Sequence, residues 1–139
     1  MKKGGHDLRA RSSVVIIEND KVLLIERNLD ETIYYVFPGG GIEAGEDRES
    51  AAKREALEEL GVDVYVNECF AEVNYKGSSQ YFYLSEIISG EIGTGQGEEY
   101  TDETRERGTY KPMWVDLQEL SSIDVRPIEV AAKIQSLFT

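Results

Sequence analysis

The stretch from residue 40 to residue 62 constrains this chain most, because it joins a glycine-rich loop to a short acidic helix. Pro38 ends the segment before it, and the glycines that follow let the backbone turn tightly and approach a ligand closely. Residues 47–60 are strong helix formers, and Gly61 is placed to end the helix as a C-terminal cap. The stretch therefore predicts a tight loop that opens directly into a helix.

This predicted helix carries three carboxylates on one face. Glu55, Glu58 and Glu59 stand at positions i, i+3 and i+4, which lie together at about 100° per residue. An acidic stripe is usually a solvated helix surface, but oxygen ligands at this spacing also suit Mg²⁺ or Mn²⁺. The adjoining face is expected to pack on the core through Ala52, Ala56, Leu57 and Leu60.

The spacing of the whole stretch resembles the Nudix box, G-x5-E-x7-R-E-U-x-E-E-x-G-U, in which U is an aliphatic residue. All seven fixed positions are filled, by Gly40, Glu46, Arg54, Glu55, Glu58, Glu59 and Gly61. At a usage of roughly 6% per residue type, such a match arises by chance about once in 10⁸ starting points. The preceding residues, Phe37-Pro38-Gly39-Gly40, are also similar to the family.

The resemblance implies an α/β fold, an α/β/α sandwich around a mixed β-sheet. It also implies hydrolysis of a pyrophosphate bond in a nucleoside diphosphate linked to another group, such as a nucleoside triphosphate or a nucleotide sugar. Divalent metal, Mg²⁺ or Mn²⁺, would be held by the three glutamates and by the backbone carbonyl of Gly39. Arg54 is expected to orient these carboxylates and Glu46 to brace the loop. The family's general base is either a box glutamate or a later loop acid, and we favour Glu55.

Residues 90–108 form the least regular part of the chain, rich in glycine and acidic residues. A long loop inside a compact domain is usually functional or disordered. The resemblance implies that a carboxylate from this region completes the metal site or acts as base, and Glu98 and Glu99 are the candidates. The alternative for each is a solvated acidic loop.

Candidate substrate contacts lie before the box. Arg27, where a predicted strand approaches the glycine loop, would hold a substrate phosphate; its alternative role is a surface ion pair. Tyr34, Tyr35 and Phe37 could stack on a nucleobase, although at least one of them is expected to pack in the core instead. Gly39 and Gly40 would let the backbone approach the substrate.

The charge balance narrows the classes of partner. The formal net charge of −12 over 139 residues argues against a nucleic acid polymer or an anionic membrane as partner. It also opposes a phosphorylated small molecule, unless bound divalent cations reverse the local sign. A phosphorylated or nucleotide substrate and a metal site are therefore linked hypotheses.

Single residues exclude other chemistries. His6 is the only histidine and Cys69 the only cysteine, so neither a histidine-based triad nor a cysteine-based zinc site can be assembled. We expect Cys69 to be a buried small hydrophobe. Without a signal peptide or a long apolar run, a cytoplasmic protein is expected.

We expect one domain over residues 1–139, with residues 1–7 as a flexible tail. The remaining pattern predicts strands over 8–18, 21–27, 33–37, 63–75, 80–89 and 111–115, with a helical turn over 116–120. Turn residues at Asn19-Asp20 and at Lys76-Gly77-Ser78-Ser79 predict that the strands on either side of each turn form hairpins. Pro127 is expected to open a final helix that packs inward through Ile128, Ala131, Ala132, Ile134 and Leu137.

Three function classes follow. The first is a metal-dependent hydrolase, and the resemblance allows it to act as a homodimer. The second is a non-catalytic Nudix-like module that binds nucleotides or regulates, although such modules often lose the box acids. The third is an acidic interaction domain with an accidental motif.

The sequence does not specify the substrate. The proline or tyrosine that some subfamilies carry at a fixed distance past the box is absent at that spacing, which weakens ADP-ribose and dinucleoside polyphosphate assignments without excluding them. The upstream pattern expected of coenzyme A hydrolases is not evident, and a nucleoside triphosphate or a nucleotide sugar stays open.

Overall fold

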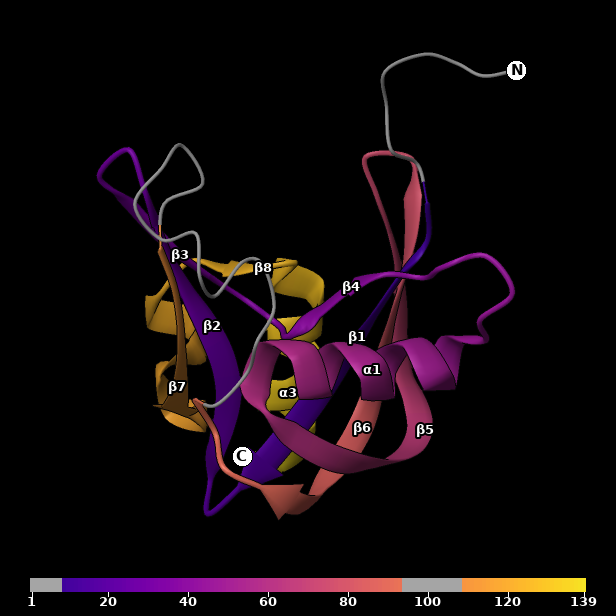
Figure 1. The fold of residues 1–139 in the computed structure, drawn as a ribbon. Coiled ribbons are helices and arrows are strands. Elements are labelled where there is room, and N and C mark those ends of the chain that lie inside the picture. The colour runs from indigo at the N-terminus through magenta and orange to yellow at the C-terminus, as the bar shows by residue number, and fades with distance from the viewer. Residues whose placement is uncertain (1–8, 94–108) are drawn as a thin grey trace.

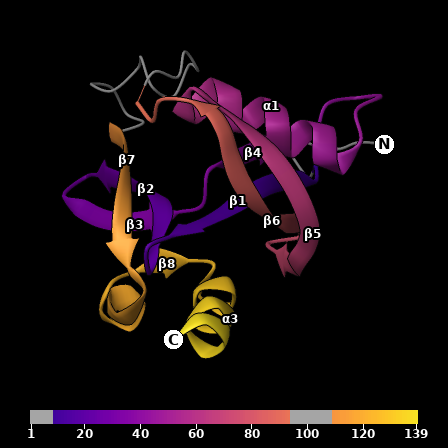
Figure 2. The same cartoon turned by 90° about the horizontal axis from the view of Figure 1, so that it is seen from below.

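The computed structural model describes residues 9–93 and 109–139, which form a mixed β-sheet between two helices (Figure 1). The layers are clearest from below, where α1 covers one face of the strands and α3 covers the other (Figure 2). The α/β/α sandwich predicted from the sequence is therefore confirmed. Within this described part of the chain, no helix is both long and apolar enough to cross a membrane.

The described residues form eight strands and three helices. The strands are β1 (Arg11–Glu18), β2 (Lys21–Leu29), β3 (Thr32–Val36), β4 (Gly39–Gly41), β5 (Val62–Tyr75), β6 (Ser78–Gly90), β7 (Thr109–Asp116) and β8 (Val125–Arg126). The helices are α1 (Arg48–Leu60), the 3₁₀ helix η1 (Leu117–Ser122) and α3 (Ile128–Phe138). The predicted strands and helices therefore all occur, with ends shifted by a few residues.

The sheet opens where the glycine strand enters it. Its main path runs β5-β6-β1-β2-β3-β8, with β4 paired to β1 and β7 paired to β2. Near their shared turn β1 and β2 pair with each other, but Arg11–Ser13 at the start of β1 pair with Gly39–Gly41 instead. The two strands of the hairpin thus diverge, and β4 lies along the open end of β1.

Two-residue turns set the hairpin registers. Asn19 and Asp20 both have positive φ, as do Lys76 and Gly77, which is the backbone of a type I′ turn. This geometry matches the right-handed twist of paired strands, so β1–β2 and β5–β6 are antiparallel hairpins. Both hairpins were predicted from the turn residues.

The strands are buried on both faces, so alternate residues enter different cores. Val15 and Phe82 belong to the core under α3, whereas Val14 and Tyr83 belong to the core under α1. The buried face of α1 consists of Ala51, Ala52, Glu55, Ala56 and Leu60. Leu57 is 50% exposed, so its predicted inward position is wrong. Leu57 lies about 100° beyond Ala56 around the helix, outside the arc that touches the sheet.

Two further burial predictions are wrong. On α3 the buried residues are Val130, Ala131 and Ile134, and the expected inward residues Ile128, Ala132 and Leu137 are exposed. Contacts with η1 and β8 fix the rotation of this helix, which the repeat of apolar residues alone does not. Cys69 is exposed, because register shifts in β5 at this point turn Phe70 into the core instead.

Candidate active site

The glycines of β4 allow the acidic face of α1 to lie directly against the backbone. A Cβ atom on Gly40 would collide with the carboxylate of Glu55, and one on Gly39 would collide with Ser13 and the backbone of Ser12. The Gly39 N–H donates a hydrogen bond to Glu59 Oε1 at 2.8 Å. Two of the three helix carboxylates therefore adjoin the glycine strand.

Arg54 connects the carboxylates to the loop. Its guanidinium makes two hydrogen bonds to Glu46, at 2.8 and 3.0 Å, and donates to Glu55 Oε2 at 3.0 Å and Glu58 Oε1 at 3.3 Å. It also donates to the Gly41 carbonyl at 2.9 Å. The hydrogen bond with Glu46 is the main cause that raises the pKa of Arg54, and it likewise lowers the pKa of the Glu46 carboxyl. Arg54 therefore stays charged and holds carboxylates from two segments in one network.

The loop between β4 and α1 is braced by its own acids. Glu46 Oε1 accepts the Glu43 N–H at 3.0 Å, and Asp47 caps the helix by accepting the Ser50 N–H at 2.7 Å. Gly45 supplies the left-handed backbone, with φ of 82°, that lets the loop turn into the helix. The helix start is thereby fixed, which fixes the direction in which the box glutamates project.

The donor set suits a hard cation by its chemistry. Glu55, Glu58 and Glu59 offer carboxylate oxygens, and Gly39 on β4, whose N–H binds Glu59, offers a backbone carbonyl. Within residues 9–93 and 109–139, no group of three acidic, His or Cys side chains already converges as a metal cluster. Glu58 is 48% exposed and Glu55 only 10%, so Glu58 has the most freedom to turn toward a cation.

The two predicted substrate residues upstream lie in other contacts. Arg27 Nε donates to the Thr109 carbonyl at 3.0 Å, and its guanidinium lies 3.7 Å from the Tyr110 ring centre. The Tyr35 hydroxyl donates to Glu26 at 3.1 Å, and burial together with this carboxylate raises the pKa of the phenol. Both roles stay predictions, whereas Glu98 and Glu99 lie outside the described residues.

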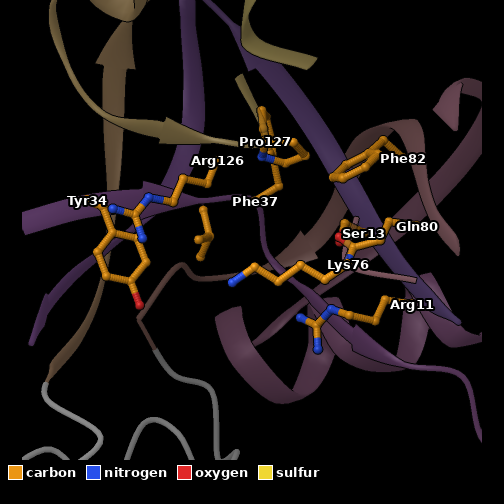
Figure 3. Close-up of a pocket in the computed structure, with 10 residues that line it drawn as sticks. Arg11, Ser13, Tyr34, Phe37, Lys76, Gln80, Phe82, Arg126 and Pro127 are labelled. Carbon is orange, nitrogen blue, oxygen red and sulfur yellow. The ribbon is translucent and has the colours of Figure 1, made fainter. Parts of the chain in front are cut away.

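A pocket of about 320 Å³ lies next to the glycine strand (Figure 3). Its lining includes three cationic side chains, Arg11, Lys76 and Arg126, together with Tyr34. Arg11 also donates to the Gly39 carbonyl at 3.4 Å, which links the pocket to β4. Sequence reasoning named Tyr34 as a candidate for stacking but missed the three cations, because they are far apart in the chain and belong to no motif. The low number of basic residues in an acidic chain is the only sequence signal for them.

Comparison with known proteins identifies the family. The NUDIX domain family matches residues 7–134. The chain belongs to the Nudix family. The prediction made from the box spacing is therefore confirmed, and the Nudix chain described here uses its box glycines and acids as one packed unit.

Individual relatives are distant. The NAD-capped RNA hydrolase NudC of Vibrio atlanticus (strain LGP32) is 26% identical over 125 residues, which is 89% of this Nudix chain and 40% of the relative. A NUDIX hydrolase from Nitrosomonas europaea has 20% identity and a TM-score of 0.72, covering 93% of this chain and 87% of the other. An ADP-ribose pyrophosphatase from Streptococcus suis has 19% identity and a TM-score of 0.69, covering 94% and 91%. The two solved structures share the fold.

Proposed function

We propose that this chain is a metal-dependent pyrophosphohydrolase acting on a nucleoside diphosphate linked to another group. The observation that carries the proposal is the packing of Glu55 and Glu59 against the Gly39–Gly40 backbone, with Arg54 holding Glu55 and Glu58. Two proteins similar to this chain, an NAD-capped RNA hydrolase and an ADP-ribose pyrophosphatase, agree with this substrate class.

The cation would be Mg²⁺ or Mn²⁺. Glu55, Glu58, Glu59 and the Gly39 carbonyl would hold it. When bound, it supplies charge neutralisation for the phosphates and a lower pKa for a nearby water. The protein needs such a charge, because a chain with a net charge of −12 otherwise repels a diphosphate.

In the proposed reaction, a water oxygen forms a bond to one phosphorus atom of the diphosphate. The bond from that phosphorus to the bridging oxygen breaks, and the departing phosphate keeps the electron pair. The proton of the water passes to a carboxylate, for which we propose Glu55, since it is the most buried of the three and adjoins Gly40. Arg54 is a positioning residue that keeps Glu55 and Glu58 oriented.

The test is a substrate panel with Mg²⁺, Mn²⁺ or chelator, containing ADP-ribose, NAD, UDP-glucose and GTP. We expect metal-dependent cleavage of at least one member, with ¹⁸O from labelled water in one phosphate product, which identifies the phosphorus that is attacked. Metal binding is measured separately by calorimetry without substrate. Nucleotide binding without cleavage of any member would overturn the enzymatic proposal and favour a binding module.

A further inference from the structure

The pocket beside β4 has a charge opposite to that of the protein. The chain has 15 Lys and Arg residues against 27 Asp and Glu residues. Nevertheless Arg11, Lys76 and Arg126 all line this one pocket, and the described residues that line it include no Asp or Glu. The carboxylate of Asp124 forms an ion pair with Arg126 at 2.8 Å and is not part of the lining. A site that gathers cations in an acidic protein is suited to attract an anion out of an otherwise repulsive field.

The three cations reach the pocket from separate parts of the fold. Arg11 lies on β1, Lys76 in the β5–β6 turn and Arg126 on β8. Figure 3 shows the Lys76 amine extending into the space between Arg11 and Tyr34, while Arg126 reaches over the Tyr34 ring. Arg126 donates two hydrogen bonds to Asp124, at 3.2 and 2.8 Å, so it contributes mainly charge and its remaining N–H groups. Together with the Arg11 guanidinium and the Lys76 ammonium, it surrounds a small volume with positive charge and with N–H donors suited to phosphate oxygens.

The aromatic lining does not favour a stacked nucleobase. Phe37 and Phe82 are 4% and 2% exposed and pack edge to face, with ring centres 5.5 Å apart. The Arg126 guanidinium lies 4.1 Å from the Tyr34 ring centre and covers one side of that ring. The charged ends of the cations, rather than the flat faces of the aromatic rings, therefore define what this pocket contacts.

The pocket is also close to the proposed site of cleavage. Ser13, which lines it, pairs with Gly39 across the β1–β4 register, and Arg11 donates to the carbonyl of the same glycine. The N–H of Gly39 binds Glu59 on α1. A ligand whose diphosphate lies at the box glutamates can therefore extend a second group into the pocket.

We propose that Arg11, Lys76 and Arg126 recognise a phosphate that is not part of the diphosphate being cleaved. The substrate class is then a nucleoside diphosphate derivative that carries an additional phosphomonoester on the nucleoside or on the linked group. This inference rests on the proposed function for the identity of the ligand as a substrate. It adds a specificity determinant that the Nudix box does not contain.

The test uses ligand pairs that differ by one phosphomonoester: NADP⁺ against NAD⁺, and coenzyme A against dephospho-coenzyme A. Dissociation constants are measured by calorimetry in chelator at fixed ionic strength, and kcat/KM is measured with Mg²⁺. We expect the extra phosphate in at least one pair to lower the dissociation constant and to raise kcat/KM by about tenfold or more, because it gains charge-assisted hydrogen bonds. Raising the salt concentration should reduce this preference.

Two variants on different elements locate the effect. Lys76→Gln and Arg126→Gln should each bring the ratio within the preferred pair toward one, and glutamine at position 76 meets the same positive-φ backbone that lysine meets. Lys21→Gln is the matched control, since Lys21 pairs with Asp116 at the exposed end of β2 and should leave the ratio unchanged. Thermal melting of each variant confirms that it folds.

The outcomes separate the two proposals. Equal affinity and equal cleavage within both pairs in the wild-type protein would overturn the pocket inference and leave the hydrolase proposal intact. A preference in binding with no metal-dependent cleavage in the substrate panel would overturn the hydrolase proposal alone. A preference that survives in both pocket variants would also overturn the assignment to these residues.

Discussion

The acidic network around Arg54 and the basic pocket around Lys76 adjoin the same short strand, β4, yet they are built in different ways. The network comes from one continuous segment, in which Arg54 contacts acids of the loop and of its own helix. The pocket takes its cations from β1, from the β5–β6 turn and from β8. The residues of the acidic network can be recognised from their spacing in the sequence, whereas the residues of the basic pocket come together only when the sheet forms.

This difference assigns separate tasks to the two regions. Carboxylates gather cations and so serve the proposed cleavage of a diphosphate, which needs charge neutralisation at the reacting atoms. Cations at a neighbouring pocket serve recognition of an anionic group, which needs directed donors. In a strongly acidic protein each device contributes separately to the binding of a polyanion, so mutations in one region should leave the task of the other intact.

The largest expected effect separates cleavage from recognition. Glu59→Gln removes a negative charge, while the amide oxygen of glutamine can still accept the Gly39 N–H. We expect kcat to fall on the order of 10²- to 10³-fold, a loss typical of removing one electrostatic contact to the reacting group. The affinity preference for the extra phosphate, measured by calorimetry in chelator, should stay at its wild-type value.

The control for this substitution is Glu119→Gln, which removes an exposed carboxylate of η1. It should retain wild-type kcat under the same conditions. If Glu59→Gln kept full turnover with Mg²⁺, the metal role of the helix carboxylates would be wrong. If it abolished the phosphate preference as well, the two regions would not be separate.

The second prediction concerns Arg54, whose loss leaves Glu46 and Glu55 without their shared cation. Arg54→Gln should lower kcat by roughly 10- to 100-fold, since partners that orient metal-binding groups have effects of this size. It should also reduce the free energy of unfolding by about 2 kcal/mol, less than for a fully buried pair because the network is partly exposed. Kinetics and urea denaturation measure the two effects.

Arg54→Lys provides the comparison, because lysine keeps the charge but cannot make the paired hydrogen bonds to Glu46. We expect it to recover stability more than activity. A merely structural role for Arg54 predicts instead that both recover together, and that the Mg²⁺ concentration for half-maximal activity does not change in either variant.

The third prediction uses the glycines that both regions share. Gly40→Ala places a methyl group against the Glu55 carboxylate, which is the far end of a side chain and can move aside. We expect a loss of about tenfold in kcat, as for a displaced orienting group, with little change in melting temperature. Gly39→Ala meets the backbone of Ser12 and Ser13 instead, so it should lower the melting temperature markedly.

A reversed outcome would change the interpretation of β4. If Gly40→Ala destabilised the fold while Gly39→Ala impaired only turnover, the glycines would serve packing and catalysis in the opposite order. Equal effects at both positions would indicate that β4 acts as one rigid unit whose disturbance affects the carboxylates and the pocket together.

The sequence predicted the features of the acidic network but not those of the basic pocket. The box predicted α1 with its cap at Gly61, and the turn residues predicted the hairpins, because these features depend on neighbours in the chain. The sequence did not show the pocket, because Arg11 and Arg126 come to line the same cavity only when the strands are arranged in their order in the sheet.

Burial at single positions failed for a related reason. The inward positions of Leu57 and Cys69 were wrong because the rotation of α1 and the irregularity of β5 are set by packing and by strand register. The repeat of apolar residues along a helix predicts how wide the buried face is, but it does not predict how the helix is rotated about its axis against the sheet. Predictions drawn from fixed local spacing were therefore more successful than predictions of which side chain a distant element covers.

The smallest expected effect is a difference in how the stability of the two regions responds to low pH. The pKa of Asp47 is lowered below its ordinary value of 3.8, chiefly by the backbone N–H of Ser50 that it accepts at the helix start. A carboxyl with a lowered folded-state pKa stabilises the fold above its unfolded pKa, and this contribution disappears as the pH falls through the folded-state value. Arginine and lysine keep their charge in this range, so acid should loosen the N-terminus of α1 before it alters the pocket cations.

Asp47→Asn tests this point, because asparagine can still cap the helix but cannot ionise. Melting temperatures measured between pH 3 and pH 7 should fall less steeply for Asp47→Asn than for the wild-type protein, whereas Asp47→Ala should be less stable than both at pH 7. Hydrogen exchange should show the difference first at the amides of residues 48–51. If the melting temperatures of the wild type and Asp47→Asn fell in parallel with pH, the Asp47 carboxyl would contribute nothing to acid sensitivity. The N-terminus of α1 would then not be more sensitive to acid than the region of the basic pocket.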